Sequence, residues 1–464
     1  MTVSEGAAAA PATLEQFGYK QELKRSLGLL DLLIYGLVFI VPTAPFSVYG
    51  IVFNAGHGMV PLIYVVGLVA MLFTAFSYQS LSEAFPVAGS VYAYAARSIG
   101  PSVGFIAGWA LLLDYLLLPT LALVAAAIAF NALVPEIPKP AWIVAMLAFN
   151  TIVNYLGIES TAKANFILLG IQAAVLIALM GMCVAGLVHG TGGAHLSLTP
   201  FFNAREFTPG LIFGALSLAV LSFLGFDAIS TLSEEVKGGP KMVGRATILS
   251  LCLCAFVFIA QTWLVTLFAL GRTSFPPGDA TNDALYGIAS LLGGAWLKFA
   301  VAIPGVALSS IACAMVGQAA TARLLFGMAR DGKLPRVLAH VHSDRKIPDY
   351  AVFFVAAVTL ALGFFFADKF ELITSLVSFG ALAGFLLLHI SVVAHFIVRT
   401  KSRNWLKHLV SPTIGFVIIG YVLWNAETNA KIAGSCWLAA GIVILLFLRL
   451  TGRAQTLPTE QNIA

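Results

Sequence analysis

The feature that most constrains this chain is a series of apolar segments, each long enough to cross a lipid bilayer. A bilayer-spanning helix needs about 20 mostly apolar residues. The sequence predicts twelve such segments, at 29–53, 60–82, 102–130, 140–157, 164–188, 209–233, 244–270, 285–320, 350–367, 371–397, 410–426 and 432–450. Only 10% of the 464 residues are charged, whereas soluble domains carry roughly a quarter. We therefore expect an all-α membrane protein with twelve transmembrane helices.

The lysine and arginine residues predict how the chain is oriented, because they accumulate in cytoplasmic loops. When the N-terminus is placed inside, 20 of the 26 lysines and arginines fall on the cytoplasmic side. The polar start of the chain, followed by basic residues at 20–25, is typical of a cytoplasmic tail and not of a cleavable signal peptide. We predict a cytoplasmic tail at 1–27, one membrane domain at 28–450 and a second cytoplasmic tail at 451–464 of a multi-pass protein in the cell inner membrane.

Composition and motifs argue against several classes of function. The five cysteines lie almost entirely in apolar runs and have neither metal-ligand nor disulfide spacing. The net charge of +5 comes from cations that orient the chain, so it does not indicate a nucleic-acid partner. The sequence has no Ser-His-Asp set and no HExxH, Walker or GxGxxG motif. We therefore expect no enzymatic activity, no cofactor and no metal site.

Two apolar segments are interrupted at corresponding places. The first contains Val41-Pro42-Thr43-Ala44-Pro45, and its two prolines cannot donate backbone hydrogen bonds. The sixth contains Ser222, Gly225 and Asp227 within about one and a half turns. These segments are five helices apart, as are equivalent helices of two five-helix repeats, and paired broken helices indicate a transport site. The alternative is that the prolines only kink a transmembrane helix.

Two carboxylates lie inside apolar segments, where charged side chains are rare and usually mark a substrate, ion or proton path. Asp227 is predicted to bind an ammonium group; its alternative role is a structural ion pair or helix cap. Asp114, surrounded by leucines, is predicted to bind a second amine, to carry a coupling proton or to hydrogen-bond a neighbouring helix. Burial favours the protonated form of a carboxyl group, which suits a proton carrier.

Other candidates are hydroxyl groups and aromatic rings beside the two interruptions, and Tyr115, whose ring can contact a cation. The predicted substrate-binding residues are Thr43, Phe46, Ser47, Asp114, Tyr115, Ser222, Phe223, Gly225, Phe226 and Asp227. The first interruption has two prolines and no glycine, so its backbone is a poor cradle for a carboxylate. This favours an amine without a carboxylate; an amino acid would need the backbone amides at 46–48.

Two further stretches resemble the amino acid–polyamine–organocation (APC) superfamily of secondary transporters. They are FPVAGSVYAY at 85–94, followed by GFIAGW at 104–109, and ARLLFGMARDGKLP at 322–335. The resemblance extends over about residues 25–450. It implies a LeuT-like fold of two inverted five-helix repeats with broken helices 1 and 6. The superfamily contains monomers and dimers, so the resemblance leaves open whether the chain forms a homodimer.

Within the superfamily, the chain looks most like bacterial putrescine importers, on the stretches 108–109, 113–116, 222–227 and 231–235. This resemblance implies that a permease imports a small organic cation, putrescine or a related polyamine or amine, by proton symport, with sodium coupling left open.

Two positions depart from the resemblance. Ser47 stands where those importers carry an aspartate, so a monoamine remains an alternative. Gln172 stands where amino acid carriers of the superfamily often have a lysine, and Asp114 and Gln172 are the coupling candidates. The alternative function is an α-amino acid permease or exchanger.

Overall fold

A computed structural model describes residues 14–278, 281, 283–367, 369–426 and 428–450. These residues form helices and connecting segments and contain no β-strand. The principal helices are α1 (Leu29–Ile40), α2 (Pro45–Ala55), α3 (Val60–Ala84), α4 (Ser90–Ser98), α5 (Pro101–Leu133), α6 (Lys139–Tyr155), α7 (Ile158–Val188), α8 (Pro209–Ala219), α9 (Pro240–Thr266), α11 (Ala284–Ala302), α12 (Ser309–Arg330), α13 (Asp349–Phe366), α14 (Phe370–Val392), α15 (Ser411–Trp424) and α16 (Thr428–Leu450). The predicted tail 451–464 and residues 1–13 of the tail 1–27 lie outside the described residues.

Short 3₁₀ or π-helical turns connect or extend these helices. They are η1 (Leu14–Phe17), η2 (Thr191–Gly193), η3 (Val220–Phe223), η4 (Phe226–Glu235), η5 (Leu267–Ala269), η6 (Ile303–Leu308), η7 (Arg336–Ala339), η8 (Val393–Arg399) and η9 (Leu406–Val410). Several helices begin with a proline in their first turn, as in α5, α8 and α9. Proline is favoured there because the first turn needs no N–H donor and the ring presets φ.

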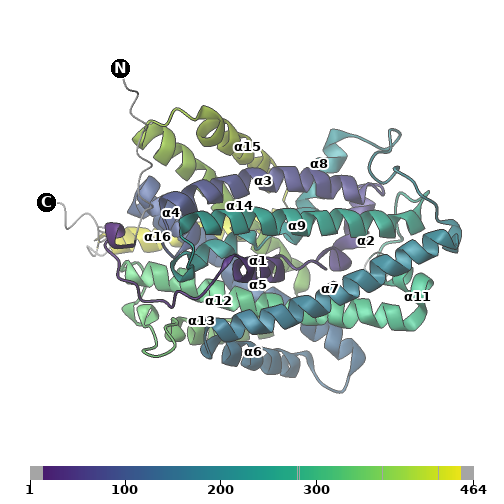
Figure 1. Ribbon diagram of the computed structural model, residues 1–464, viewed down its shortest axis with the longest axis horizontal. Coiled ribbons are helices and arrows are strands. Elements are labelled where there is room, and N and C mark those ends of the chain that lie inside the picture. Colours follow the sequence, from purple (N-terminus) through teal and green to yellow (C-terminus); the bar gives the residue numbers. More distant parts are fainter. Residues whose placement is uncertain (1–13, 279–280, 282, 368, 427, 451–464) are drawn as a thin grey trace.

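The long helices run along the long axis of the molecule, and α1 and α2 follow one another near its centre (Figure 1). Ten helices among the described residues are long and apolar enough to cross a membrane, or eleven when the bent pair α1–α2 is taken as one span. The predicted fourth segment is α6, which has 17 residues and a length of roughly 26 Å, less than the ~30 Å hydrocarbon core. The count of twelve spans and the inverted repeat stay predictions.

The interruption predicted at Pro42–Pro45 is present. Helices α1 and α2 meet at a 53° bend, and Val41 at the end of α1 has φ 63°. A β-branched residue rarely adopts this left-handed conformation, so the break carries backbone strain. The side chain of Gln261, in α9, donates a 2.9 Å hydrogen bond to the Pro42 carbonyl that the break leaves free.

The sixth predicted segment is also interrupted. Helix α8 and the turn η3 end at an extended Leu224, and Gly225 then adopts φ 113° before η4 begins. A Cβ atom at Gly225 would lie 3.0 Å from the backbone C and O atoms of Phe39, in α1. Glycine therefore serves two purposes here, because it permits the left-handed turn and lets the two broken helices touch.

Proline also shapes α5, in the middle of the bundle. Pro119 has no N–H group, so it cannot bond the carbonyl of Tyr115 one turn earlier. The Thr321 hydroxyl, in α12, donates to that carbonyl at 2.5 Å. Gly317 lets α12 approach at this level, since a Cβ atom there would lie 2.8 Å from Pro119. A neighbouring helix thus satisfies the freed backbone group, as buried membrane segments require.

The segment predicted at 285–320 changes its helical pitch at Pro304-Gly305. The π-helical turn η6 joins α11 to α12 without a gap, and the chain is helical from Ala284 to Arg330. The sharper change lies earlier, at Gly294 in α11, where φ is 67° and ψ is −157°. This long segment therefore starts with a separate short helix, which ends at the kink.

Candidate substrate site

Asp114 and Asp227 lie together at the centre of the bundle. Asp227 lies in the first turn of η4, just after the second break, and Asp114 lies in α5. Asp227 is 0% exposed and Asp114 is 1% exposed. Tyr115, the residue after Asp114 in α5, donates a hydrogen bond to Asp227, so the two acids lie on elements that are in contact. Oxygen Oδ1 of each carboxylate is buried without a side-chain hydrogen-bond partner among the described residues. The structure therefore brings together the two acids that the sequence singled out.

Two tyrosine hydroxyls hold the other oxygen of Asp227. Tyr115, next to Asp114 in α5, donates to Oδ2 at 2.7 Å, and Tyr78, in α3, donates to the same oxygen at 3.4 Å. Tyr115 was predicted as an aromatic face for a cation, but its hydroxyl in this structure orients the carboxylate. Hydrogen bonds to an ionised carboxylate are stronger than neutral ones, so this arrangement fixes the position of Asp227.

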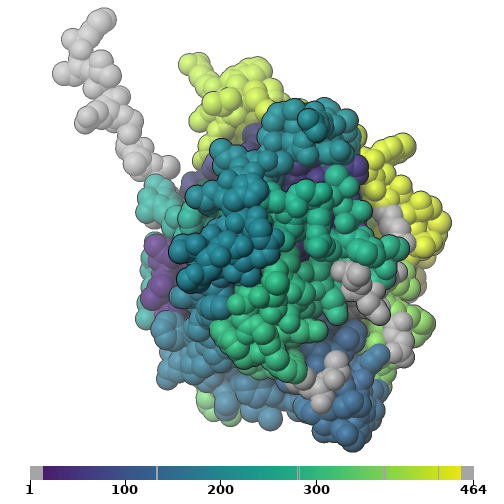
Figure 2. Space-filling model, turned by 90° about the vertical axis from the view of Figure 1, so that its right-hand side faces the viewer, coloured from purple at the N-terminus to yellow at the C-terminus, as the bar shows by residue number. Residues whose placement is uncertain are grey.

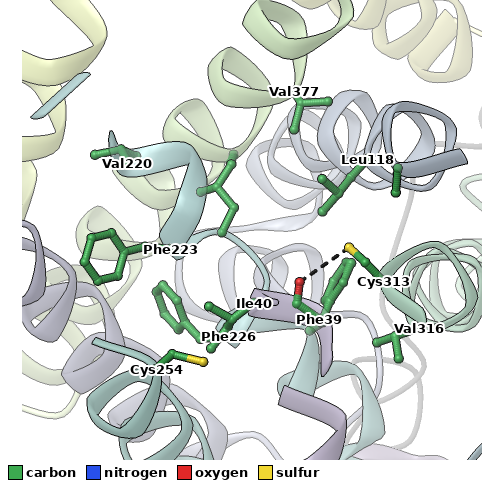
Figure 3. Packing of buried hydrophobic residues seen from close by; sticks show 14 of the residues in the cluster. Phe39, Ile40, Leu118, Val220, Phe223, Phe226, Cys254, Cys313, Val316 and Val377 are labelled. Carbon is green, nitrogen blue, oxygen red and sulfur yellow. Dashed lines mark hydrogen bonds between the residues drawn. The ribbon is translucent and has the colours of Figure 1, made fainter. Parts of the chain in front are cut away.

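The other candidates in the sixth segment pack around the break as hydrophobic or hydroxyl neighbours. Phe226 contacts the rings of Tyr78 and Phe385, with centroid distances of 6.0 and 5.8 Å. Ser222 forms a 3.1 Å hydrogen bond with Tyr64, whose ring also packs on Phe223. Figure 3 shows the rings of Phe223 and Phe226 to the left of Ile40 and Phe39, with Cys313 Sγ directed at the Phe39 carbonyl.

The candidates in the first segment divide into two groups. Thr43 is buried and donates to the Gly305 carbonyl at 2.5 Å, so it links the first break to η6. Phe46 is 1% exposed, and Gly305 packs against its ring. Ser47 is exposed on α2, so the structure does not bring its side chain into the buried cluster. Ser47, one of the two positions that depart from the resemblance, is therefore not part of the buried cluster.

Gln172 is buried in α7, which packs against α1, η6 and α12. Neither its amide nitrogen nor its amide oxygen has a hydrogen-bond partner among the described residues. Burying an unpaired amide costs free energy, roughly 1–3 kcal/mol. Gln172 is thus a buried polar group of α7 that the protein itself does not satisfy, although no hydrogen bond joins it to Asp227 or Asp114 in the described part of the chain.

Buried ion pairs close the end of the bundle that carries the two described chain ends. Arg323 forms a bidentate ion pair with Glu235, and the two side chains are 4% and 1% exposed. Next to it, Arg330 donates twice to Glu234, at 2.7 and 3.0 Å, and the Ala88 amide donates to Glu234 at 2.9 Å. The stretches 85–94 and 322–335 therefore meet at the end of η4.

The segment before α1 covers this same end. Backbone amides of Ser26 and Leu27 donate to the Glu235 carbonyl at 3.0 and 3.1 Å. The hydroxyls of Tyr19 and Tyr92 donate to the two oxygens of Asp331 at 2.6 and 2.7 Å. Burial, followed by the Asp331 charge, raises the pKa of Tyr92 well above its usual range, so this donor keeps its proton.

The opposite end is closed as well. In Figure 2 this end faces the viewer and is covered by teal and green segments from the middle of the chain. The carbonyl and amide of Phe275 bond the Asn54 side chain at 3.0 and 2.6 Å. Gly50 is pressed against this connection, since a Cβ atom there would lie 1.9 Å from the Thr281 carbonyl oxygen. Packed segments therefore cover both ends of the bundle, and the two acids between them are buried.

Sequence reasoning missed Tyr78, Tyr64 and the partners of the ion pairs. Tyr78 follows Thr74 and Ser77 at helical spacing, and this hydroxyl stripe on α3 was the available signal for an inward-facing surface. No spacing connects Arg323 to Glu235, which are 88 positions apart. The sequence placed both in charged segments at one end but could not pair them.

Comparison with known proteins identifies the family. The family model described as amino acid permease matches residues 32–453. The chain is 34% identical to the low-affinity putrescine importer PlaP of Escherichia coli over 452 residues, 96% of this chain and 97% of the relative. It is 27% identical to the branched-chain amino acid permease BcaP of Bacillus subtilis, over 92% of this chain and 93% of the relative.

A third relative is the methylthioribose transporter of Bacillus subtilis, at 25% identity over 93% of this chain and 95% of the relative. All three relatives are named as transporters and none as an enzyme. The APC resemblance is thus confirmed, and the many apolar helices agree with a multi-pass membrane protein. The chain therefore belongs to the amino acid permease family, whose members are transporters and not enzymes.

Proposed function

We propose that the protein imports a small organic cation, with putrescine or a related polyamine as the first candidate and a monoamine as the second. Uptake is driven by proton symport. Asp227 binds the ammonium group between the two broken helices, and Asp114 either carries the coupling proton or binds a second amine. The printed function of the 34% identical relative, putrescine import, supports this choice.

The observation that carries the proposal is a buried pair of acids without a basic partner. Among the described residues, no lysine or arginine forms an ion pair with Asp114 or Asp227, while Arg323 and Arg330 are engaged by Glu235 and Glu234. Two neighbouring carboxylates away from water cannot both stay ionised without a counter-charge. A bound cation or a shared proton supplies that charge, and a proton-coupled amine importer uses both.

The main alternative is transport of an α-amino acid, which the branched-chain permease relative represents. Such a substrate needs backbone N–H groups for its carboxylate, and the available ones are at the start of α2. The Phe46 amide already donates to the Thr43 carbonyl at 2.9 Å, and the Ser47 amide donates to Ala44 at 3.3 Å. An anion would have to compete with these bonds, which favours an amine without a carboxylate.

The proposal includes the placement of the chain in the inner membrane. The domain covers 28–450, with cytoplasmic tails at 1–27 and 451–464. Helix α6, the fourth predicted segment, also crosses the membrane and brings the number of spans to twelve. Both described ends lie at one end of the bundle, because Arg97 stacks on Phe17 at 4.7 Å and Arg449 bonds Ser102 at 2.6 Å. Two ends on one side require an even number of spans.

The test is uptake of labelled putrescine into proteoliposomes with an imposed inward proton gradient. Unlabelled spermidine, a monoamine, arginine and alanine serve as competitors, and empty vesicles are the control. We expect saturable uptake that amines block and alanine does not. Competition by neutral amino acids alone would make the protein an amino acid permease. A sodium gradient that replaces the proton gradient without loss would rule out proton coupling.

Replacing Asp114 by asparagine is expected to separate binding from accumulation. If Asp114 carries the proton, amine affinity should change by less than about threefold, or ~0.7 kcal/mol. Accumulation above the equilibrium level should nevertheless be lost. Equilibrium binding and gradient-driven uptake are measured on the same preparation, with Glu22→Gln, an exposed acid, as the control. Unchanged accumulation would leave Asp114 a structural role only, and lost binding would assign it to the substrate.

A further inference from the structure

A basic segment and an apolar groove lie side by side between α14 and α15. Residues 372–426 contain four lysines and arginines and no aspartate or glutamate. Lys401, Arg403 and Lys407 all lie in the connection from η8 to η9 or within η9, and the first two are exposed. No ion pair or side-chain hydrogen bond of these three cations is present among the described residues. The local charge is therefore positive and uncompensated.

The fourth cation, Arg399, is used within the protein. Its guanidinium donates to the carbonyls of Arg97 and Ile99 at 2.7 and 3.0 Å, so η8 is tied to the end of α4. Arg97 adds another positive charge on the neighbouring element and contacts the rings of Phe17 and Tyr19. The elements packed against the basic segment thus contribute cations too.

The groove begins next to this segment and has a volume of about 360 Å³. Its walls are mainly apolar and include Val393, Ala394 and Val398 from η8, which continues α14, and Pro412 and Phe416 from α15. In Figure 1, α15 lies at the upper edge of the bundle, so the groove is between a peripheral helix and the main body. Val398 and Phe416 are 68% and 40% exposed, as expected for surfaces that face lipid.

The histidine of the groove already has hydrogen-bond partners. His389 is 1% exposed, and its two ring nitrogens lie 3.0 Å from the Ser77 hydroxyl and 3.3 Å from the Thr74 hydroxyl. Gly415 lets α15 pack directly on this ring, since a Cβ atom there would lie 2.3 Å from the imidazole. The histidine thus helps to shape the groove floor and has no nitrogen left for an anionic ligand.

The basic segment also carries the side chains of a membrane interface. Trp405 and Leu406 are 61% and 73% exposed and stand directly between Arg403 and Lys407. Tryptophan is enriched at the boundary between headgroups and acyl chains, and lysine and arginine lie at the headgroups. This places the cations at the depth of lipid phosphates and the groove at the depth of the upper acyl chain.

We propose that the groove between α14 and α15 and the basic segment 401–407 form a binding site for one anionic phospholipid. An acyl chain lies along Val393, Ala394 and Phe416, and the phosphate is held by Lys401, Arg403 and Lys407. Basic pockets between transmembrane helices bind anionic headgroups by this combination of charge and apolar surface. The site is separate from the acid pair and does not depend on which substrate is transported.

The test is native mass spectrometry of the delipidated full-length protein, titrated with phosphatidylglycerol or with phosphatidylcholine of the same acyl chains. The wild type should retain phosphatidylglycerol at an at least tenfold lower concentration than phosphatidylcholine, a difference of ~1.4 kcal/mol. Lys401→Gln/Arg403→Gln/Lys407→Gln should lose this preference. The control Lys20→Gln/Lys241→Gln/Arg336→Gln removes three exposed cations elsewhere and should keep it.

A second variant tests the groove with all cations in place. Ala394→Trp fills the space beside Val393, and it should reduce phosphatidylglycerol retention at least tenfold. Equal retention in the wild type and the 401/403/407 variant would overturn the proposal, as would equal loss in the control. Displacement of phosphatidylglycerol by millimolar glycerol phosphate would indicate that the cations bind the headgroup alone and that the groove contributes nothing. If the lipid-free protein is a dimer and the 401/403/407 substitutions dissociate it, this face is a contact between two copies of the chain.

Discussion

Replacing Asp227 by asparagine is expected to reduce amine uptake at least 100-fold while the protein remains folded. Asparagine has nearly the same shape and still accepts a hydrogen bond from Tyr115, which lies 2.7 Å from the carboxylate. It lacks the negative charge that offsets an ammonium group in a water-excluded site. Removing one partner of such a buried pair costs roughly 2–5 kcal/mol, and 100-fold corresponds to about 2.7 kcal/mol.

The measurement is initial-rate uptake in proteoliposomes, together with size-exclusion and thermal-melting profiles of the purified variant. Tyr115→Phe is the matched control, because it removes the hydroxyl that positions Asp227 and keeps the charge. It should cost about tenfold, the lower end of the roughly 1.5–3 kcal/mol that one hydrogen bond to a charged group is worth, because Tyr78 still donates to the same oxygen. Normal transport by Asp227→Asn would exclude the carboxylate as the cation site.

Replacing Arg323 by glutamine is expected to destabilise the protein by about 3–5 kcal/mol. The change leaves Glu235 as a buried charge without its partner, and both side chains are almost inaccessible to water, at 4% and 1% exposure. The Glu235 carbonyl also receives two backbone bonds from Ser26 and Leu27, so the segment before α1 should loosen with it. Thermal unfolding in detergent measures the first effect, and protease sensitivity of the N-terminal segment measures the second.

Two further variants separate the buried charge from the general loss of a side chain. The double variant Arg323→Met/Glu235→Leu removes both charges and should recover most of the stability, as apolar replacements of buried ion pairs often do. Arg330→Gln should cost less than Arg323→Gln, because the Arg330 side chain is 12% exposed and Glu234 keeps the Ala88 amide. A melting temperature of Arg323→Gln equal to that of the wild type would contradict a stabilising role of the Arg323–Glu235 pair.

Much of the architecture could be predicted because the signals are local. The long apolar segments follow from the cost of placing backbone and charge in lipid, and each corresponds to a helix in the structure. The break at Pro42–Pro45 follows from the missing N–H groups of two prolines. The burial of Asp227 was predictable from the apolar residues on either side of it.

The candidate site was less accessible to prediction. Ser47 was chosen for its place beside the first break, but α2 turns its side chain to an exposed surface. Tyr115 was chosen for its ring, and its hydroxyl is the part that contacts Asp227. Which face a helical residue presents depends on how the helix rotates against its neighbours, and an almost uniformly apolar helix has no periodicity from which to read that rotation.

The amino-acid sequence alone determined that this is a helical membrane protein of the amino acid permease family, with two interrupted helices and two acids inside apolar segments. Those properties depend on the transfer of residues from water to lipid and on backbone groups a few positions apart. Only the tertiary structure decided that Asp114 and Asp227 are neighbours, that tyrosines from α3 and α5 hold one oxygen of Asp227, and that Arg323 pairs with Glu235. These contacts join helices far apart in the chain, and the packing of the whole bundle sets them.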